Sequence, residues 1–441
     1  MSAIRKKLES TNVAVLVVYT MIAAFASYAS MYAFRKPFTA TSYEGLTAFT
    51  LFGVTFGYKP IAVIAQLLGY MGSKFIGIKV ASEASMSKRV PLVLMLILFA
   101  ELMLIGFALT PAPYNILFLF LNGLPLGMVW SFLFGIIEGR KISEFLGLAM
   151  SVSVIFSSGV VKSVGRWLMT DFNVPEFWMP AATGACFIPL LLIALYMMYQ
   201  VPPPTEEDVA VRSKRHSMSL DDRKSFLKQY FWGVVFLVIG YLALMVYRDI
   251  RDTFMIDIMK EMGHTVEPSM FVTIESWVGV GVIVILCSFW KVNKNSTAVK
   301  LSLGLIALGA ILLGSSTVML EKGMLSPVAF YILNGFGLYV SFVLYQSILM
   351  DRLLGSIKTL ATASFLIAIA DSYGYFSTVA LYLAKDIFSK IYGVEIQWIE
   401  ILTYASYFVA IIVPLMTILV LIYFKSRMIP RKEFQQEATK T

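Results

Sequence analysis

The chain has 441 residues, of which 58% are hydrophobic and 14% are charged, and its formal net charge is +9. A soluble globular domain has roughly 45–50% apolar and about 25% charged residues. This composition therefore excludes a soluble globular domain and indicates a polytopic membrane protein. The positive charge does not indicate nucleic-acid binding, because the cations gather in alternate loops between apolar runs and no basic run is interleaved with aromatic residues.

About twelve mostly apolar runs follow one another along the chain, and each is long enough to cross about 30 Å of hydrocarbon. The first run comes after Arg5, Lys6 and Lys7 and is too long for a signal peptide, so we expect a retained membrane helix. The first six helices are expected near 11–36, 52–81, 90–110, 113–139, 142–169 and 176–200. The second six are expected near 228–258, 268–291, 298–320, 325–350, 358–385 and 399–425.

One long polar segment, Val201 to Lys228, separates the two sets of runs. We therefore predict an N-terminal six-helix bundle over 1–200, a cytoplasmic linker over 201–228, and a C-terminal bundle with a short tail over 229–441. Lys and Arg are concentrated at both ends, in this linker and in alternate loops, which places the termini in the cytoplasm. The protein is expected in the cell membrane, which is the inner membrane in a Gram-negative cell.

The two halves of the chain echo each other. S-Y-A-S-M-Y-A-F-R-K around Arg35 reads like Y-L-A-L-M-V-Y-R-D around Arg248, and F-L-N-G-L-P-L-G after Phe120 reads like I-L-N-G-F-G-L after Ile332. Parallel repeats of six helices, related by an axis along the membrane normal, are typical of the major facilitator arrangement, in which the binding site lies near midplane between the halves. The expected fold is therefore all-α, with two six-helix bundles related by a pseudo-two-fold axis.

Arg35 and Arg248 both fall in apolar runs, and we expect both to lie within membrane helices. An arginine at membrane depth costs roughly 2.5–3.5 kcal/mol on insertion scales. Two cations at matching positions of the two halves have an obvious use as a clamp for an anion. The pattern therefore predicts a transporter of a small anionic solute.

Three motifs, the first in two parts, resemble those of the organophosphate:phosphate antiporter branch of the major facilitator superfamily, the glycerol-phosphate and hexose-phosphate exchangers. Y-A-S-M-Y-A-F-R-K-P-F (Tyr28 to Phe38) is similar to the family's Y-x-x-Y-x-x-R-K-N-F, and G-S-K-F-I-G (Gly72 to Gly77) to its G-x-S-K-F-x-x-G. N-G-L-P-L-G-M-V-W (Asn122 to Trp130) is similar to N-G-x-x-Q-G-x-G-W. Tyr247-Arg248-Asp249 with E-S-W-V-G (Glu275 to Gly279) is similar to the helix-seven and helix-eight motifs.

This resemblance implies a rocker-switch antiporter that exchanges a phosphorylated organic compound for phosphate. By motif, Arg35 and Arg248 would form the clamp, Lys36 and Lys74 would support it, and Glu275 would serve in coupling or gating. The chain departs from the family at three places: Ser157 replaces a histidine, Leu126 replaces a glutamine, and 81–84 lacks the usual arginine.

Further intramembrane residues are candidates on their own chemistry, because ionisable groups inside a membrane are functional by default. The substrate-binding candidates beyond the motifs are Tyr28, Tyr32, Lys162 and Arg251, and the coupling or gating candidates are Glu101, Asp249 and Asp371. Two other interpretations stay open for them. Arg248 and Asp252 are spaced for an i,i+4 ion pair, and aromatic helix faces commonly serve packing alone.

No catalytic or cofactor motif is present in the sequence. It has no Gly-rich phosphate loop ending in Lys-Ser or Lys-Thr, no metal-ligand cluster and no plausible Ser/His/Asp set. We expect a monomer that is not an enzyme, holds no cofactor or metal, binds no nucleic acid and has membrane lipid and its solute as partners. Two other functions stay open: a proton-coupled carrier of another organic anion, and a transporter-like membrane sensor.

Overall fold

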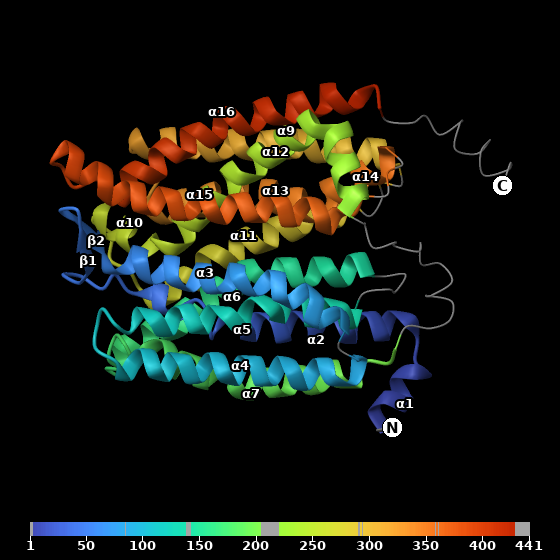
Figure 1. Cartoon of the computed structure of the whole chain (residues 1–441), viewed down its shortest axis with the longest axis horizontal. Coiled ribbons are helices and arrows are strands. Elements are labelled where there is room, and N and C mark those ends of the chain that lie inside the picture. Colours follow the sequence, from blue (N-terminus) through green and yellow to red (C-terminus); the bar gives the residue numbers. More distant parts are fainter. Residues whose placement is uncertain are drawn as a thin grey trace, which may run out of the picture. The chain divides into compact units, whose positions relative to one another are not determined.

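Long apolar helices make up most of the chain in a computed structural model that describes residues 3–83, 85–137, 143–203, 220–289, 292, 294–357, 359 and 361–427 (Figure 1). The helices of the first half are α1 (Ala3–Glu9), α2 (Val13–Tyr32), α3 (Tyr58–Glu83), α4 (Met86–Leu109), α5 (Ile116–Ile137), α6 (Ser143–Asp171) and α7 (Met179–Gln200). Those of the second half are α9 (Leu220–Thr253), α10 (Met255–Glu261), α11 (Pro268–Ser288), α12 (Asn295–Glu321), α13 (Pro327–Leu344), α14 (Met350–Ile357), α15 (Ala363–Tyr392) and α16 (Trp398–Lys425).

Ten helices of the described residues are long and apolar enough to cross a membrane. Helices α3 and α6, of 26 and 29 residues, also have the necessary length. The protein is thus an all-α multi-pass membrane protein with about the number of spans expected from the sequence. A π-helical turn, Tyr345–Leu349, joins α13 to α14 without a break in the span.

Several predicted helix boundaries are wrong: α9 begins at Leu220 and not at 228, and α15 ends at Tyr392 and not at 385. Two others lie next to the site. The first membrane helix ends at Tyr32 and not at 36, and a short 3₁₀ helix, Pro37–Ala40, follows it. The second membrane helix begins at Tyr58 and not at 52, because strands β1 (Thr47–Leu51) and β2 (Val54–Gly57) form an antiparallel hairpin before it. The alternation of Thr with apolar residues on both sides of Phe52-Gly53 is the period-2 signal of this hairpin.

The described contacts divide the chain into two compact units. The first unit comprises Met1–Ser213, Asp252–Ser276 and Val379–Trp398, and the second comprises Lys214–Arg251, Trp277–Thr378 and Ile399–Thr441. Two segments of the second half thus pack with the helices of the first half. The bundle boundaries predicted at 200 and 229 stay a prediction, and most of the predicted linker lies outside the described residues.

Glycines allow the closest helix contacts in each unit, because a residue without a Cβ lets two backbones approach. In the first unit, a Cβ on Gly123 of α5 would lie 2.2 Å from the Gln66 carbonyl oxygen of α3, and one on Gly69 would lie 2.1 Å from the Phe120 carbonyl oxygen. In the second unit, a Cβ on Gly335 of α13 would lie 2.3 Å from a guanidinium nitrogen of Arg251. The repeated Asn-Gly pair therefore marks a close contact in both units.

Candidate functional site

The break after α2 brings Arg35 and Lys36 into the first unit's polar interior. Both residues lie past the end of the helix at Tyr32, so the expectation that Arg35 lies within a membrane helix is wrong. Pro37, which has no N–H group to continue a helix, starts the 3₁₀ helix that follows.

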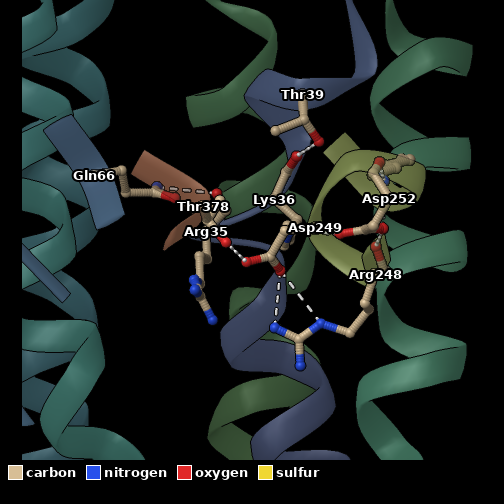
Figure 2. A network of polar contacts seen from close by, with 10 residues as sticks. Arg35, Lys36, Thr39, Gln66, Arg248, Asp249, Asp252 and Thr378 are labelled. Atoms are coloured by element: carbon tan, nitrogen blue, oxygen red, sulfur yellow. Dashed lines mark hydrogen bonds and ion pairs between the residues drawn. The ribbon is translucent and has the colours of Figure 1, made fainter. Parts of the chain in front are cut away.

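Two buried amides satisfy backbone carbonyl groups in the segment that follows this helix end. Gln66 Nε2 donates to the Arg35 carbonyl at 3.0 Å, and Asn122 Nδ2 donates to the Phe34 carbonyl at 3.0 Å. Gln66 also donates to Asn122 Oδ1 at 2.8 Å, so the two side chains act as one bridge (Figure 2 shows Gln66 and Arg35). Terminal carbonyls without partners are costly inside a membrane, and this bridge removes that cost.

Aromatic rings surround the start of this break. The Arg35 guanidinium lies over the Tyr70 ring, with its central carbon 3.9 Å from the ring centroid. Tyr28 and Tyr32 are buried, and their ring centroids lie 5.6 Å apart. The Tyr28 ring centroid also lies 4.8 Å from the Trp130 ring centroid. The structure thus shows packing roles for both tyrosines, and their contact with a substrate stays a prediction.

Asp252 is the centre of the first unit's charge cluster. Its Oδ2 lies 2.5 Å from Lys36 Nζ, and its Oδ1 lies 2.6 Å from Lys162 Nζ. Ser158 Oγ donates to Asp252 Oδ1 at 2.5 Å, and Lys162 also donates to the Asp252 backbone carbonyl. Lys162 is 2% exposed and Asp252 is 8% exposed, so their ion pair lies almost out of contact with water, whereas the Lys36 side chain is 15% exposed. The structure thus brings two predicted cations together on a residue that the sequence suggested only as a partner for Arg248.

Glu275 lies beside this cluster, on α11. It is buried, and its Cβ and Cγ would lie 2.9 and 3.0 Å from a Cβ placed on Gly159, between Ser158 and Lys162 on α6. The absence of a side chain at Gly159 is therefore what allows α11 to bring this carboxylate against α6. The proposed coupling role of Glu275 stays a prediction.

Two more ion pairs continue from Asp252 along the segment that contains α10. Lys59 Nζ lies 2.5 Å from Asp257 Oδ2 and is buried, and Lys260 Nζ lies 2.5 Å from Glu44 Oε1 in an exposed position. The hydrogen bond from Lys260, together with its charge, lowers the pKa of the Glu44 carboxyl. The segment 252–260 is thus held to the first unit by three successive ion-paired positions.

Arg248 is paired within the second unit. Its Nη2 and Nε lie 2.8 and 3.2 Å from Asp249 Oδ1, and Thr378 Oγ1 donates to Asp249 Oδ2 at 3.2 Å (Figure 2). The guanidinium also lies 4.4 Å from the Phe342 ring centroid. The i,i+4 partner considered for Arg248 is Asp252, whose carboxylate is bound to the two lysines instead. Arg35 belongs to the first unit and Arg248 to the second, so their action as a clamp stays a prediction.

Arg251 and Asp371 also have defined contacts in the second unit. Arg251 is 1% exposed, donates to the Tyr331 carbonyl at 2.8 Å and occupies the space beside Gly335. Tyr241 donates to Asp371 Oδ1 at 2.6 Å. Arg251 therefore serves packing between α9 and α13, and its contact with a substrate stays a prediction, as does the coupling role of Asp371.

Glu101 and Lys74 complete the predicted set. Glu101 is 8% exposed, and its Oε2 has no hydrogen-bond partner among the residues that the structure describes. That oxygen would lie 2.2 Å from a Cβ on Gly184, so the carboxyl fills the space that this glycine leaves. Lys74 lies on α3, but its side chain is outside the described part of the chain.

A family model described as "Family of unknown function (DUF5690)" matches residues 37–427. The chain belongs to this family. No curated protein shows significant similarity to this DUF5690 chain.

Solved structures show which fold the DUF5690 chain has. A crystal structure of a D-xylose–proton symporter matches with a TM-score of 0.62 at 12% identity and covers 93% of this chain and 97% of that one. A major facilitator proton:xylose symporter bound to 6-bromo-6-deoxy-D-glucose matches with a TM-score of 0.62 at 14% identity. The match covers 94% of this chain and 96% of that one. A POT family transporter in complex with 5-aminolevulinic acid matches with a TM-score of 0.56 at 15% identity. The match covers 93% of this chain and 96% of that one. The DUF5690 chain therefore has the major facilitator fold.

Some residues at this site were not among the sequence candidates. They are Ser158, Asp252, Lys59 and Asp257 in the DUF5690 chain's first unit. A weak signal exists for the acidic ones, because Asp252, Asp257 and Lys260 recur along a short segment between two apolar runs. Their partners lie elsewhere in the sequence, so the pattern alone does not identify them.

Proposed function

We propose that the protein is a secondary active transporter of a small anionic solute that works by alternating access. The observation that carries this proposal is the convergence of Lys36 and Lys162 on the carboxylate of Asp252, at 2.5 and 2.6 Å. Two ammonium groups on separate elements, one buried and one partly buried, hold one carboxylate and therefore have the charge and spacing to hold an oxyanion of a solute. Charges inside a membrane protein are costly, which favours a functional reason for three of them in one cluster.

The finer proposal is exchange of a phosphorylated organic compound for inorganic phosphate. It is supported by the motifs around Arg35, Lys36 and Arg248 and by the planar guanidinium fork, which matches phosphate oxygens with paired hydrogen bonds. Arg35 and Arg248 would close on the phosphoryl group, with the lysines of the first unit assisting. Exchange requires that the cations favour a change of conformation only with an anion bound, which the phosphate-counterflow experiment below tests.

Proton coupling is the second candidate for the driving force. Glu101 favours it, because no described residue gives its buried Oε2 a hydrogen bond. A carboxyl group in such a place is poorly stabilised as an anion and suited to carrying a proton. Two of the similar structures are of proton symporters by their titles, which supports gradient-driven transport of some kind.

Counterflow in proteoliposomes tests the proposal. Vesicles loaded with inorganic phosphate would take up labelled phosphate through the parent protein, and Lys162→Ala would abolish most of this uptake. Lys162→Arg, which keeps the charge, would retain part of it. Lys260→Ala is the matched control, because it removes a lysine from an exposed ion pair and should leave uptake unchanged.

The outcomes separate the candidates. Full uptake by a folded Lys162→Ala protein would refute the role of the cluster. Uptake of organic anions that needs no internal phosphate but stops with an uncoupler and in Glu101→Gln would select proton coupling. Anion binding without any flux would select the sensor.

A further inference from the structure

The turn of the β1–β2 hairpin places a large apolar ring where turn chemistry disfavours it. Leu51 pairs with Val54, so the turn has two central residues, Phe52 and Gly53, with φ angles of +49° and +75°. Two central residues in the left-handed region define the hairpin turn that favours Asn-Gly, since asparagine tolerates this conformation and larger side chains resist it. Phe52 thus carries backbone strain, and its ring is 95% exposed.

The hairpin is two-faced around this turn. Phe49 and Leu51 alternate with Thr50 along β1, and their partners across the ladder are Phe56 and Val54. Thr50 pairs with Thr55 on the other face, with the two hydroxyl oxygens 3.2 Å apart. Phe49 and Leu51 are both exposed, so one face of the hairpin and its turn offer apolar surface while the other is polar.

The C-terminal end of α15, residues 385–392 and here called its outer end, holds the hairpin in place within the first unit. Asp386 Oδ2 accepts a hydrogen bond from the Gly57 amide at 3.0 Å, and Lys390 donates to the Gly53 carbonyl in the turn itself. The same end of α15 exposes apolar side chains: Ile387, Phe388, Ile391 and Tyr392. The hairpin turn and this helix end therefore present apolar groups side by side.

Helix rise gives the depth of this apolar surface in the bilayer. From Ala363 to Lys385, the first charged residue of the outer third of α15, the helix rises about 33 Å, close to the roughly 30 Å of hydrocarbon. Lys390 lies about 7 Å further along the helix, at the depth of the polar head groups. The Lys390 contact sets the turn at this same level, where aromatic side chains of membrane proteins are enriched.

We propose that the hairpin tip, formed by Phe49, Leu51 and Phe52, inserts into the head-group layer of the bilayer beside the outer end of α15. The strained turn then has a reason, because an asparagine at position 52 would relax the backbone but remove the ring that contacts lipid. This inference rests on the membrane topology of the chain and does not depend on the proposed solute.

A depth measurement tests the inference. Cys186 and Cys287, both exposed, would be replaced by serine, and a fluorophore would be attached at Phe52→Cys or, as the control on the polar face, at Thr50→Cys. In vesicles with nitroxide on the lipid head groups, we expect stronger quenching at position 52 than at position 50. Iodide in the water should quench the two probes in the reverse order.

A second variant separates lipid contact from turn structure. With the probe at Leu51→Cys, adding Phe52→Asn should reduce nitroxide quenching, although the turn itself becomes more favourable. Equal quenching at positions 50 and 52 would overturn the inference. It would also be overturned if iodide could not reach position 52 while no nitroxide quenched it, because protein would then cover the tip.

Discussion

Replacing Asp252 by asparagine removes the charge that neutralises buried Lys162 and partly buried Lys36. The shape of the side chain is nearly kept, but Lys36 and Lys162 lose the carboxylate that they contact at 2.5 and 2.6 Å. Removing one partner of a buried ion pair costs about 3–5 kcal/mol, because it leaves an uncompensated buried charge. Asp252→Asn should therefore lower the unfolding temperature of the purified protein clearly.

An added anion should restore much of this loss. If the two lysines can hold an oxyanion, phosphate at about a hundredfold excess over its Kd would return about 2.7 kcal/mol to the variant. The parent protein should respond less, since Asp252 already occupies the lysines. Thermal unfolding in detergent, followed with increasing phosphate and with chloride as the comparison salt, measures both effects.

Ser158→Ala is the control for this experiment. It removes one hydrogen bond to Asp252 but leaves the lysines neutralised, so it should cost about 1.5–3 kcal/mol without a response to phosphate. An Asp252→Asn protein that unfolds at the parent's temperature would refute the energetic reasoning. One that is destabilised but indifferent to phosphate would refute the anion site and leave the ion pair as a structural element.

Other parts of the fold give sharp expectations. Gly123→Ala should prevent or greatly weaken folding, because its Cβ would lie 2.2 Å from a backbone oxygen, whereas Gly72→Ala meets nothing within 4 Å and should express and unfold like the parent. Gln66→Leu should lower stability by about 1–3 kcal/mol in the same unfolding assay, because it removes the hydrogen bond to the Arg35 carbonyl just past the end of α2. Glu44 has a pKa lowered by Lys260, so the ion pair stabilises the fold above the ordinary carboxyl pKa, and this contribution disappears as the pH falls through the lowered value. Since the pair is exposed, the difference between the parent and Glu44→Gln should be at most about 1 kcal/mol at neutral pH and vanish in acid; a constant difference would contradict this assignment.

The sequence predicts the architecture well because apolar length is a local property. Runs of suitable length correspond to the long helices, and the Asn-Gly echo marks close contacts in both halves. The hairpin before α3 was missed because its residues, Thr47 to Gly57, are also apolar enough to extend a membrane run. The end of α2 was missed although Pro37 signals it, because the hydrophobic pattern continues to Phe38.

The charge cluster could be predicted only in part. Lys36 and Lys162 stand out as cations in apolar surroundings. Their shared partner, Asp252, is 216 residues from Lys36 along the chain. No local pattern reports such a pairing. Within a helix, the i,i+4 spacing favoured Arg248 as the partner of Asp252, and the tertiary contacts of the first unit prevail over this local preference.

The two Asn-Gly pairs make different contacts in the two halves of the chain. After Asn122, the missing side chain of Gly123 admits the main chain of a neighbouring helix, whereas after Asn334 the gap at Gly335 admits the head of Arg251. The same dipeptide thus allows close backbone packing of two helices in one half and accommodates an arginine side chain in the other. Both halves therefore need a glycine at this place, but for different reasons: position 123 must let two main chains approach, and position 335 must leave room for a buried guanidinium group.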